Sequence, residues 1–327
     1  MDANRNQPKT LQEAVVFYAD PNNALAYMTL LRWPDGIVTC PTCGRTDVVF
    51  LHNQRKWQCK SVHAKRQFSA KVGTIFEDSP IPLEKWLVVV WMLSNCRNGV
   101  SSYEIGRTIG VTQKSAWFML HRIRLGLQDK KGGKLGGGPH GKVEVDETFI
   151  GGKARNMHKA RRTKMHNVGM IAAKTAVMGI LERGGKVKTQ VLGRRIGKQM
   201  QQIIEDNVFP GTWVMTDEFQ GYQGLSSNYT HLVINHLERY VQGNVHTQGI
   251  ENFWSLLKRG LGGTYVAVEP FHLFRYVDEQ AFRFNNRKDG DRKISDSERF
   301  DIAMSQVIGK RLTFAELTGK VGETTPF

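Results

Sequence analysis

Residues 142–152 read KVEVDETFIGG, an alternating, Val-rich run closed by two glycines. Alternation of apolar and polar residues over this length is typical of a β-strand with one buried face, so we expect a strand here. Asp146 lies at the middle of the run. Glu144 shares its face, whereas Glu147 points to the opposite face, because side chains alternate along a strand. Periodicity alone therefore leaves both Glu144 and Asp146 as candidates for chemistry on that face.

Two further acidic residues stand in comparable settings. Asp217 ends a second strand-like run in TWVMTDEFQGY, and Glu251 opens a segment of helical period in HTQGIENFWSLLKRG. Glu218 follows Asp217 and is expected to point away from it. Two strand carboxylates and one helix carboxylate can converge on two Mg²⁺ or Mn²⁺ ions, which take oxygen ligands and keep positions open for water and phosphate. A metal pair about 4 Å apart stabilises both oxygens of a phosphoryl displacement, so the pattern indicates metal-dependent DNA chemistry.

The segment around Glu251 predicts an amphipathic helix with two stripes. The apolar stripe comprises Ile250, Phe253, Trp254, Leu257 and Leu261. Glu251, Ser255 and Lys258 form the adjacent stripe, and the two turns between Glu251 and Lys258 make them point the same way. We expect the carboxylate to bind metal and the lysine to meet a phosphate or a base. His246 has two equal interpretations: it contacts a phosphate or water, or it only begins the helix.

Composition favours a globular chain with a polyanionic partner. The chain has 327 residues, 40% hydrophobic and 23% charged, and a formal net charge of +16, so a polyanion is the expected partner. The longest apolar run, WLVVVWML, is too short to cross a membrane. No basic start followed by an apolar stretch opens the chain, so we expect a cytoplasmic protein.

Three of the four cysteines predict a zinc site. Cys40 and Cys43 form a Cys-x2-Cys pair, and Cys59 and His63 follow after fifteen residues. Two such pairs on facing turns supply the four ligands of a tetrahedral structural Zn²⁺. Four cysteines in a chain without a secretion signal also favour metal binding over disulfides. His63 is the least certain ligand.

One further histidine and the fourth cysteine need interpretations of their own. His52 is the alternative fourth ligand. Cys96 lies within the apolar helical pattern PLEKWLVVVWMLSNC and is expected to be a small core residue.

Residues 101–127 predict a helix-turn-helix. Ser101 or Ser102 can cap a first helix, Gly110 can end it, and Thr112 can cap a second. The second helix repeats apolar residues at helical spacing, namely Ala116, Leu120, Ile123 and Leu127. Its other faces are expected to present polar and basic side chains to DNA, namely Gln113, Lys114, His121, Arg122 and Arg124.

Two further segments lack hydrophobic period. KKGGKLGGGPHG, residues 130–141, is Gly-rich and predicts a flexible linker. Residues 151–198 contain thirteen Lys or Arg and one acid, Glu182. Within them GGKARNMHKARRTKMH is expected to be an exposed loop that binds phosphates, with contacts from Arg155, Arg161 and Arg162.

The segments VEVDETFIGGK, VMTDEFQGYQGL and HTQGIENFWSLLKRGLGGTY together resemble bacterial insertion-sequence DDE transposases. The most similar group is the ISXO-two-like one, which has an N-terminal zinc ribbon and a ribonuclease-H-like catalytic domain. The resemblance covers about residues 20–290. The family pattern is Asp, Asp, Glu or Asn, then Lys seven residues later, and it falls on Asp146, Asp217, Glu251 and Lys258. It selects Asp146 over Glu144. Related transposases often carry a second Cys-x2-Cys where this chain has Cys-x3-His, so the departure concerns His63.

The resemblance implies a transposase, and it implies that the expected polyanion is double-stranded DNA. Such an enzyme binds the terminal inverted repeats of its element, hydrolyses a phosphodiester to free a 3′-hydroxyl, and joins that hydroxyl to target DNA. It implies two Mg²⁺ or Mn²⁺ ions at Asp146, Asp217 and Glu251, one structural Zn²⁺, and a homo-oligomer that pairs two ends. Two alternatives stay open: a nuclease or integrase that cuts without joining, and a non-enzymatic DNA-binding regulator.

These features predict an α/β chain with a ribonuclease-H-like mixed sheet, preceded by a small zinc ribbon and a helix-turn-helix. The expected order is a helical segment at 1–37, a zinc ribbon at 38–75, a helical DNA-binding region at 76–129, the linker at 130–141, the catalytic domain at 142–290 and a partly disordered tail at 291–327.

Overall fold

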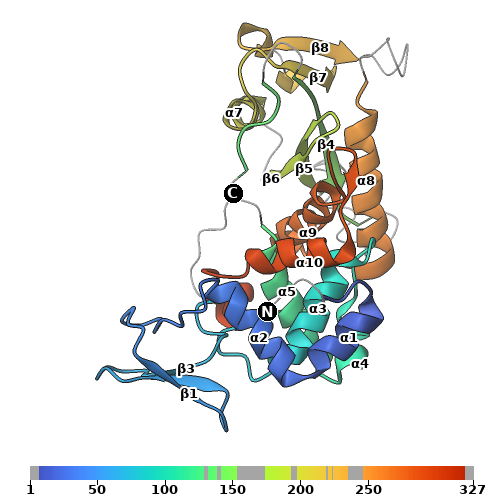
Figure 1. Ribbon diagram of the computed structural model, residues 1–327. Helices are drawn as coiled ribbons and strands as arrows, with labels where there is room; N and C mark the ends of the chain where they lie inside the picture. The colour runs from blue at the N-terminus through green and yellow to red at the C-terminus, as the bar shows by residue number, and fades with distance from the viewer. Residues whose placement is uncertain are drawn as a thin grey trace. The chain divides into compact units, whose positions relative to one another are not determined.

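The computed structural model of the chain (Figure 1) describes residues 7–128, 132–137, 141–152, 174–192, 197–218, 220–222, 224–234 and 246–320. The chain forms two compact units. The first comprises the described residues up to 128 together with residues 293–320, and the second comprises the described residues between 132 and 292. The second unit is therefore inserted, in sequence, within the first.

The first unit is helical, with a small antiparallel sheet. Its helices are α1 (Leu11–Ala19), α2 (Pro21–Arg32), α3 (Leu83–Asn95), α4 (Ser102–Ile109), α5 (Gln113–Gly126), α10 (Asp296–Ser305) and α11 (Phe314–Leu317). The sheet has the order β1-β2-β3, with strands Val48–Leu51, Lys56–Cys59 and Gln67–Phe68. Helices α1 and α2 lie within the segment expected to be helical, and Cys59 ends strand β2.

Helices α4 and α5 begin and end where their capping residues predict. The Ser101 side chain accepts a hydrogen bond from the Glu104 amide, and the Thr112 side chain accepts one from the Ser115 amide. Gly110 adopts the left-handed conformation at φ 64° that glycine tolerates. A three-residue turn thus joins two helices, and the predicted apolar stripe of α5 is buried.

In the carboxyl-terminal half of α5, side chains outside the apolar stripe are buried as well. His121, Arg122 and Arg124 are each at most 3% exposed. The Arg122 guanidinium lies over the rings of Trp86 and Phe118, and it donates to the Glu77 carbonyl. The expectation that these three basic side chains face DNA is therefore wrong for this structure, because the unit's own core surrounds them.

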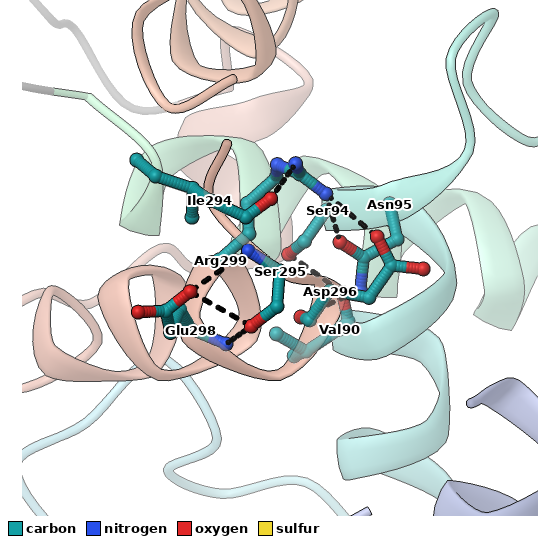
Figure 2. A network of polar contacts seen from close by, with 8 residues as sticks. All are labelled: Val90, Ser94, Asn95, Ile294, Ser295, Asp296, Glu298 and Arg299. Carbon is teal, nitrogen blue, oxygen red and sulfur yellow. Dashed lines mark hydrogen bonds and ion pairs between the residues drawn. The ribbon is translucent and has the colours of Figure 1, made fainter. Parts of the chain in front are cut away.

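Helix α10 packs against α3 although about two hundred residues separate them. Arg299 donates to the Asn95 side-chain oxygen at 2.7 Å and to the Ile294 carbonyl at 2.9 Å, and Asn95 donates to the Asp296 carbonyl at 3.1 Å (Figure 2). Phe300 enters the aromatic core with ring centroids 5.1 Å from Trp91. Residues 293–320 are therefore part of a folded unit, and the expectation of a partly disordered tail is wrong for them.

The second unit is built on a five-stranded mixed sheet of order β6-β5-β4-β7-β8. Its strands are β4 (Lys142–Ile150), β5 (Thr175–Glu182), β6 (Val187–Leu192), β7 (Trp213–Asp217) and β8 (Thr230–Ile234). Strands β4, β5 and β6 pair antiparallel, whereas β7 pairs parallel with both β4 and β8. A short ribbon follows, with β9 (Lys288–Asp289) and β10 (Arg292–Lys293).

Helices cover both faces of this sheet. On one face α7 (Gly197–Asn207) packs its Met200 and Ile204 with Val143 and Val145 of β4. On the other face α8 (Gln248–Gly260) and α9 (Leu273–Asn285) pack with Val177 of β5 (Figure 1). All five residues of the predicted apolar stripe of α8 belong to this second core. The face that carries Asp146 is therefore the face that α8 covers.

Residues 132–137, within the predicted linker, are packed against the second unit. Leu135 is buried and forms a β-bridge with Val208. The Gly136 and Gly137 amides donate to the side chains of Glu182 and Thr212 at 3.0 Å. A flexible linker is therefore the wrong description of these six residues, because Leu135 joins the apolar core of that unit.

Candidate active site

The candidate active site lies where α8 crosses the sheet beside β4. A pocket of about 420 Å³ is lined by Asp146, Glu147 and Thr148 of β4 and by Glu251, Trp254, Ser255 and Lys258 of α8. Asp146 is half-buried, and Glu251 and Lys258 are exposed. The structure thus brings together three of the four residues predicted for the chemistry.

Asp217, the fourth, ends the neighbouring strand on the same sheet face. Strand β7 pairs parallel with β4 in the register Val143↔Val214 and Glu144↔Met215. Asp146 and Asp217 each lie two residues beyond the pair Glu144↔Met215, so the same register, continued, brings them level. Asp217 is half-buried and lies outside the residues that line the pocket. Because residues level on neighbouring strands share a face, its carboxylate belongs to the same side of the sheet as Asp146.

Helix α8 also holds the Asp146 carboxylate. The Trp254 indole N–H donates to Asp146 Oδ2 at 3.0 Å, and the Glu147 amide donates to Asp146 Oδ1 at 2.8 Å. Both hydrogen bonds orient the carboxylate, and each of its oxygens can still accept a further ligand bond. Trp254 was predicted only as an apolar residue, and its polar role is a contact that sequence reasoning missed.

Glycine at position 179 makes this close approach possible. Gly179 of β5 is the register partner of Asp146. A Cβ built on Gly179 would lie 2.7 Å from Trp254 and 2.8 Å from Ile250. The indole therefore occupies the space that any side chain at position 179 would fill, and from there it reaches Asp146.

Glu144, which periodicity left as a rival of Asp146, has a different environment. Its side chain is 2% exposed, and it accepts hydrogen bonds from the Arg183 Nε and from the Ile250 amide, both at 3.0 Å. His246 Nδ1 lies 3.4 Å from the same carboxylate. These partners tie Glu144 to the start of α8. They also place His246 at the beginning of that helix, one of its two interpretations.

Glu147 points away from Asp146, as alternation predicts. Glu147 lies on the opposite face and accepts a hydrogen bond from the Tyr222 hydroxyl at 2.6 Å. Glu218 is exposed beyond the end of β7.

The donor set of the site suits a hard divalent cation. Carboxylate oxygens are the preferred ligands of Mg²⁺ and Mn²⁺. Asp146 and Glu251 present such oxygens to one open pocket, with Asp217 on the adjoining strand. Lys258 adds a cationic group to the same pocket, which suits a phosphate.

The first unit contains a second cluster of metal-ligand residues. The ligand atoms of Cys40, Cys43, Cys59 and His63 all lie within 4.8 Å of one another. Cys40 Sγ lies 3.5 Å from His63 Nε2, and Cys43 Sγ lies 3.6 Å from Cys59 Sγ. Ligands about 2.1–2.3 Å from a tetrahedral Zn²⁺ stand about 3.4–3.8 Å from each other, and these two distances fall within that range.

The surroundings of the cluster agree with this assignment. A hydrogen bond from His63 lowers the pKa of the Cys59 thiol to about 6, which favours the thiolate that binds metal. His52 instead packs edge-on against the Phe50 ring at 4.9 Å and lies outside the cluster. Cys96 follows the end of α3, also apart from the cluster.

Comparison with known proteins assigns the chain to a family. Residues 138–285 match the ISXO2-like transposase domain, and residues 20–64 match the transposase zinc-ribbon domain. The chain belongs to the ISXO2-like transposase family. Its zinc-ribbon match and its three-cysteine, one-histidine cluster together support a structural zinc ion.

Two relatives carry transposon names. An uncharacterised protein in transposable element ISH50 of Halobacterium salinarum is 25% identical over 259 residues, which cover 75% of this chain and 84% of that protein. An uncharacterised transposase-like protein of Haemophilus influenzae is 33% identical over 102 residues, which cover 31% of this chain and 82% of that protein.

The residues predicted to contact DNA have mixed placements. Lys114 is exposed, with its ammonium 5.0 Å from the centre of the Phe314 ring. Gln113 is half-buried and donates to the Ser102 hydroxyl at 2.8 Å. The predicted contacts of Arg155, Arg161 and Arg162 lie outside the described residues. Within the described part of the chain, no helix is long and apolar enough to span a membrane.

Proposed function

We propose that this chain is an insertion-sequence transposase that cuts and joins DNA, with Asp146, Asp217 and Glu251 as its catalytic carboxylates. The observation that carries the proposal is the single pocket shared by Asp146, Glu251 and Lys258, in a chain of a transposase family. Asp217, level with Asp146 on the adjoining strand, completes the acidic set.

The sheet supports a ribonuclease-H-like fold for the catalytic unit. Three antiparallel strands are followed by two parallel ones, in the order β6-β5-β4-β7-β8, with helices on both faces. This topology places Asp146 on the central strand and Asp217 on its parallel neighbour. Both acids then face the helix that carries Glu251.

The three carboxylates would hold two Mg²⁺ or Mn²⁺ ions. When bound, such a pair supplies Lewis-acid stabilisation of the charge that develops on phosphate oxygens. The chain's own contribution is positional. Trp254 fixes the Asp146 carboxylate, and Lys258 offers its ammonium to a phosphate of the bound strand.

The reaction would proceed in two displacements at this site. Water first attacks the phosphodiester at the element end, which frees a 3′-hydroxyl. That hydroxyl then attacks a phosphodiester of target DNA, forms a new phosphodiester with its 5′ side, and displaces the 3′-oxygen of the cut target strand as a free 3′-hydroxyl. Neither displacement needs a covalent bond between enzyme and DNA.

The first unit would bind the element ends. The α4–α5 pair, with its three-residue turn, has the form of a helix-turn-helix, and the amino-terminal residues of a second helix contact base edges. Lys114 and Gln113 stand at that position, whereas Arg122 is excluded by its burial. The basic residues Arg155, Arg161 and Arg162 would add phosphate contacts without reading sequence. Pairing of two ends would require a homo-oligomer on DNA.

Isosteric variants of the acids test the proposal. We expect Asp146→Asn, Asp217→Asn and Glu251→Gln each to reduce cleavage and joining of end-bearing DNA by at least about 10²-fold, because one lost carboxylate weakens a metal site. Binding to the same DNA should persist. Glu218→Gln is the matched control, since this exposed acid is expected to turn away from its neighbour Asp217, and it should cleave normally.

The products, resolved strand by strand, separate the alternatives. Cleavage without joining would make the chain a nuclease, and binding without metal-dependent nicking would make it a DNA-binding regulator. Normal cleavage by any one of the three variants would remove that residue from the site.

A further inference from the structure

Thr247, the residue before α8, does not cap the helix in the usual way. An N-cap threonine ordinarily has extended backbone angles, and its oxygen accepts a hydrogen bond from an amide of the first turn. Thr247 has φ −112° and ψ 18°, and its side chain makes no such bond. Its hydroxyl instead donates to Glu251 Oε1 at 2.9 Å, one turn along the helix.

Glu144 takes over the capping role from the sheet. Its Oε2 accepts the hydrogen bond of the Ile250 amide, the third amide of α8, at 3.0 Å. A carboxylate at this end also interacts favourably with the helix dipole. Because Glu144 satisfies the amide, the Thr247 hydroxyl can serve the Glu251 carboxylate.

Arg183 fixes the same segment from the β5–β6 turn. Its Nε donates to Glu144 at 3.0 Å, and its Nη2 donates to the His246 carbonyl at 2.7 Å. Gly249 lies against this arrangement, since a Cβ there would stand 2.8 Å from Glu144 Oε2. The start of α8 is therefore anchored to β4 and to the β5–β6 turn through two hydrogen bonds, and their two sheet-side partners, Glu144 and Arg183, form a largely buried ion pair.

We propose that Thr247 is a positioning residue, whose hydroxyl orients the Glu251 carboxylate toward the pocket. Glu144 and Arg183 hold the start of α8, and with it Thr247, in place for this role. The inference rests on the proposed function, which makes Glu251 a metal ligand. An exposed glutamate loses rotamer freedom when it binds a metal. Because the Thr247 hydroxyl already orients the Glu251 side chain, less rotamer freedom remains to be lost when the metal binds. A carboxylate oxygen accepts more than one bond, so the contact leaves the group able to bind a metal.

The test measures Mn²⁺ binding to the full chain, by electron paramagnetic resonance and by calorimetry, in the presence of uncleaved end DNA. We expect Thr247→Val, which keeps the shape and removes the hydroxyl, to weaken Mn²⁺ binding about tenfold, the range for outer-shell partners of a metal site. Thr247→Ser should restore it. Thr29→Val on α2, where the hydroxyl also bonds to a residue four positions away (the Leu25 carbonyl, at 2.8 Å), is the matched control and should bind like the parent chain.

Three outcomes decide the matter, with thermal unfolding recorded for each variant. Restoration by serine together with loss in valine supports the inference. Unchanged Mn²⁺ binding in Thr247→Val overturns it, whether or not that variant unfolds earlier. Asp146→Asn separates the proposed function from the inference. If the parent chain binds Mn²⁺ at the proposed site, this variant should lose that binding. If the two proteins bind Mn²⁺ equally, or neither binds it, the proposed metal site is absent.

A second variant addresses Glu144 by the same readout. Glu144→Gln keeps an oxygen for the Ile250 amide but loses the ion pair with Arg183. We expect weaker Mn²⁺ binding that Mn²⁺ in excess restores. A variant that folds and binds Mn²⁺ like the parent would exclude Glu144 from the positioning role.

Discussion

At the scale of single residues, the cysteines and the acids differ in how far spacing alone decides their roles. Cys40, Cys43, Cys59 and His63 were predicted from spacing, and the structure brings their ligand atoms together. Two short pairs leave few other arrangements, because each pair lies on one tight turn. The choice between His63 and His52 as the fourth ligand needed coordinates, because both histidines lie close to Cys59 in the sequence, one after it and one before it.

That choice gives the first prediction. The parent chain should carry about one Zn²⁺, and His63→Ala should lose it because a structural site needs all four ligands. His52→Ala, at a residue that packs on Phe50, should keep its zinc. Metal analysis of both purified variants checks this. Full zinc content in His63→Ala, or loss in His52→Ala, would contradict the assignment.

Glu144 shows where sequence reasoning stops among the acids. Period two places it on the same face as Asp146, and only the family resemblance separated the two. Its actual partner, the Ile250 amide, lies 106 residues further along the chain. Nothing local to KVEVDETFIGG could disclose that contact. The spacing of Thr247 and Glu251, four residues apart, was the one available signal of the helix-start arrangement.

At the scale of elements, periodicity predicted the individual strands and helices better than their junctions. The apolar stripe of α8 and the caps of α4 and α5 were confirmed. The basic residues of α5 were misplaced, because helical period shows which face is apolar but not how many neighbours surround the helix. Leu135 was likewise overlooked among glycines, although a single leucine suffices to dock a short segment.

The contact between α8 and β5 gives a prediction at this scale. Gly179→Ala should destabilise the second unit by about 1–3 kcal/mol, because the new methyl group would overlap Trp254 and Ile250. Gly133→Ala, at a glycine with open space around it, is the matched control and should cost about 0.5 kcal/mol or less. Urea denaturation of the full chain measures both.

A double variant shows whether Trp254 is the obstacle. Trp254→Phe removes the indole atoms nearest to position 179, so Gly179→Ala should cost less in that background. Equal costs in both backgrounds would mean that the indole does not require the glycine.

At the scale of the whole molecule, the chain returns to its first unit after the second unit. Helix α10 contributes Phe300 to the core beside Tyr18 and Trp91, and Tyr27 donates to Asp301 at 2.7 Å. Sequence patterns do not reveal such a return, because α10 is short and its partners are encoded some two hundred residues earlier. The consequence is that the first unit cannot be isolated as an amino-terminal fragment ending at residue 128.

Substitutions in the polar network of Figure 2 test whether α10 stabilises the first unit. Arg299→Ala should destabilise the first unit by about 1–3 kcal/mol, because Asn95 and the Ile294 carbonyl lose their half-buried partner. Arg311→Ala is the matched control: Arg311 pairs with Asp78 across a similar sequence distance, but their side chains are 55% and 70% exposed, so the cost should stay below about 1 kcal/mol. Five of the seven tryptophans belong to the first unit, so tryptophan fluorescence during denaturation reports mainly on it. Equal stability of the two variants would show that α10 is held by its apolar contacts alone, with Phe300 as the principal anchor.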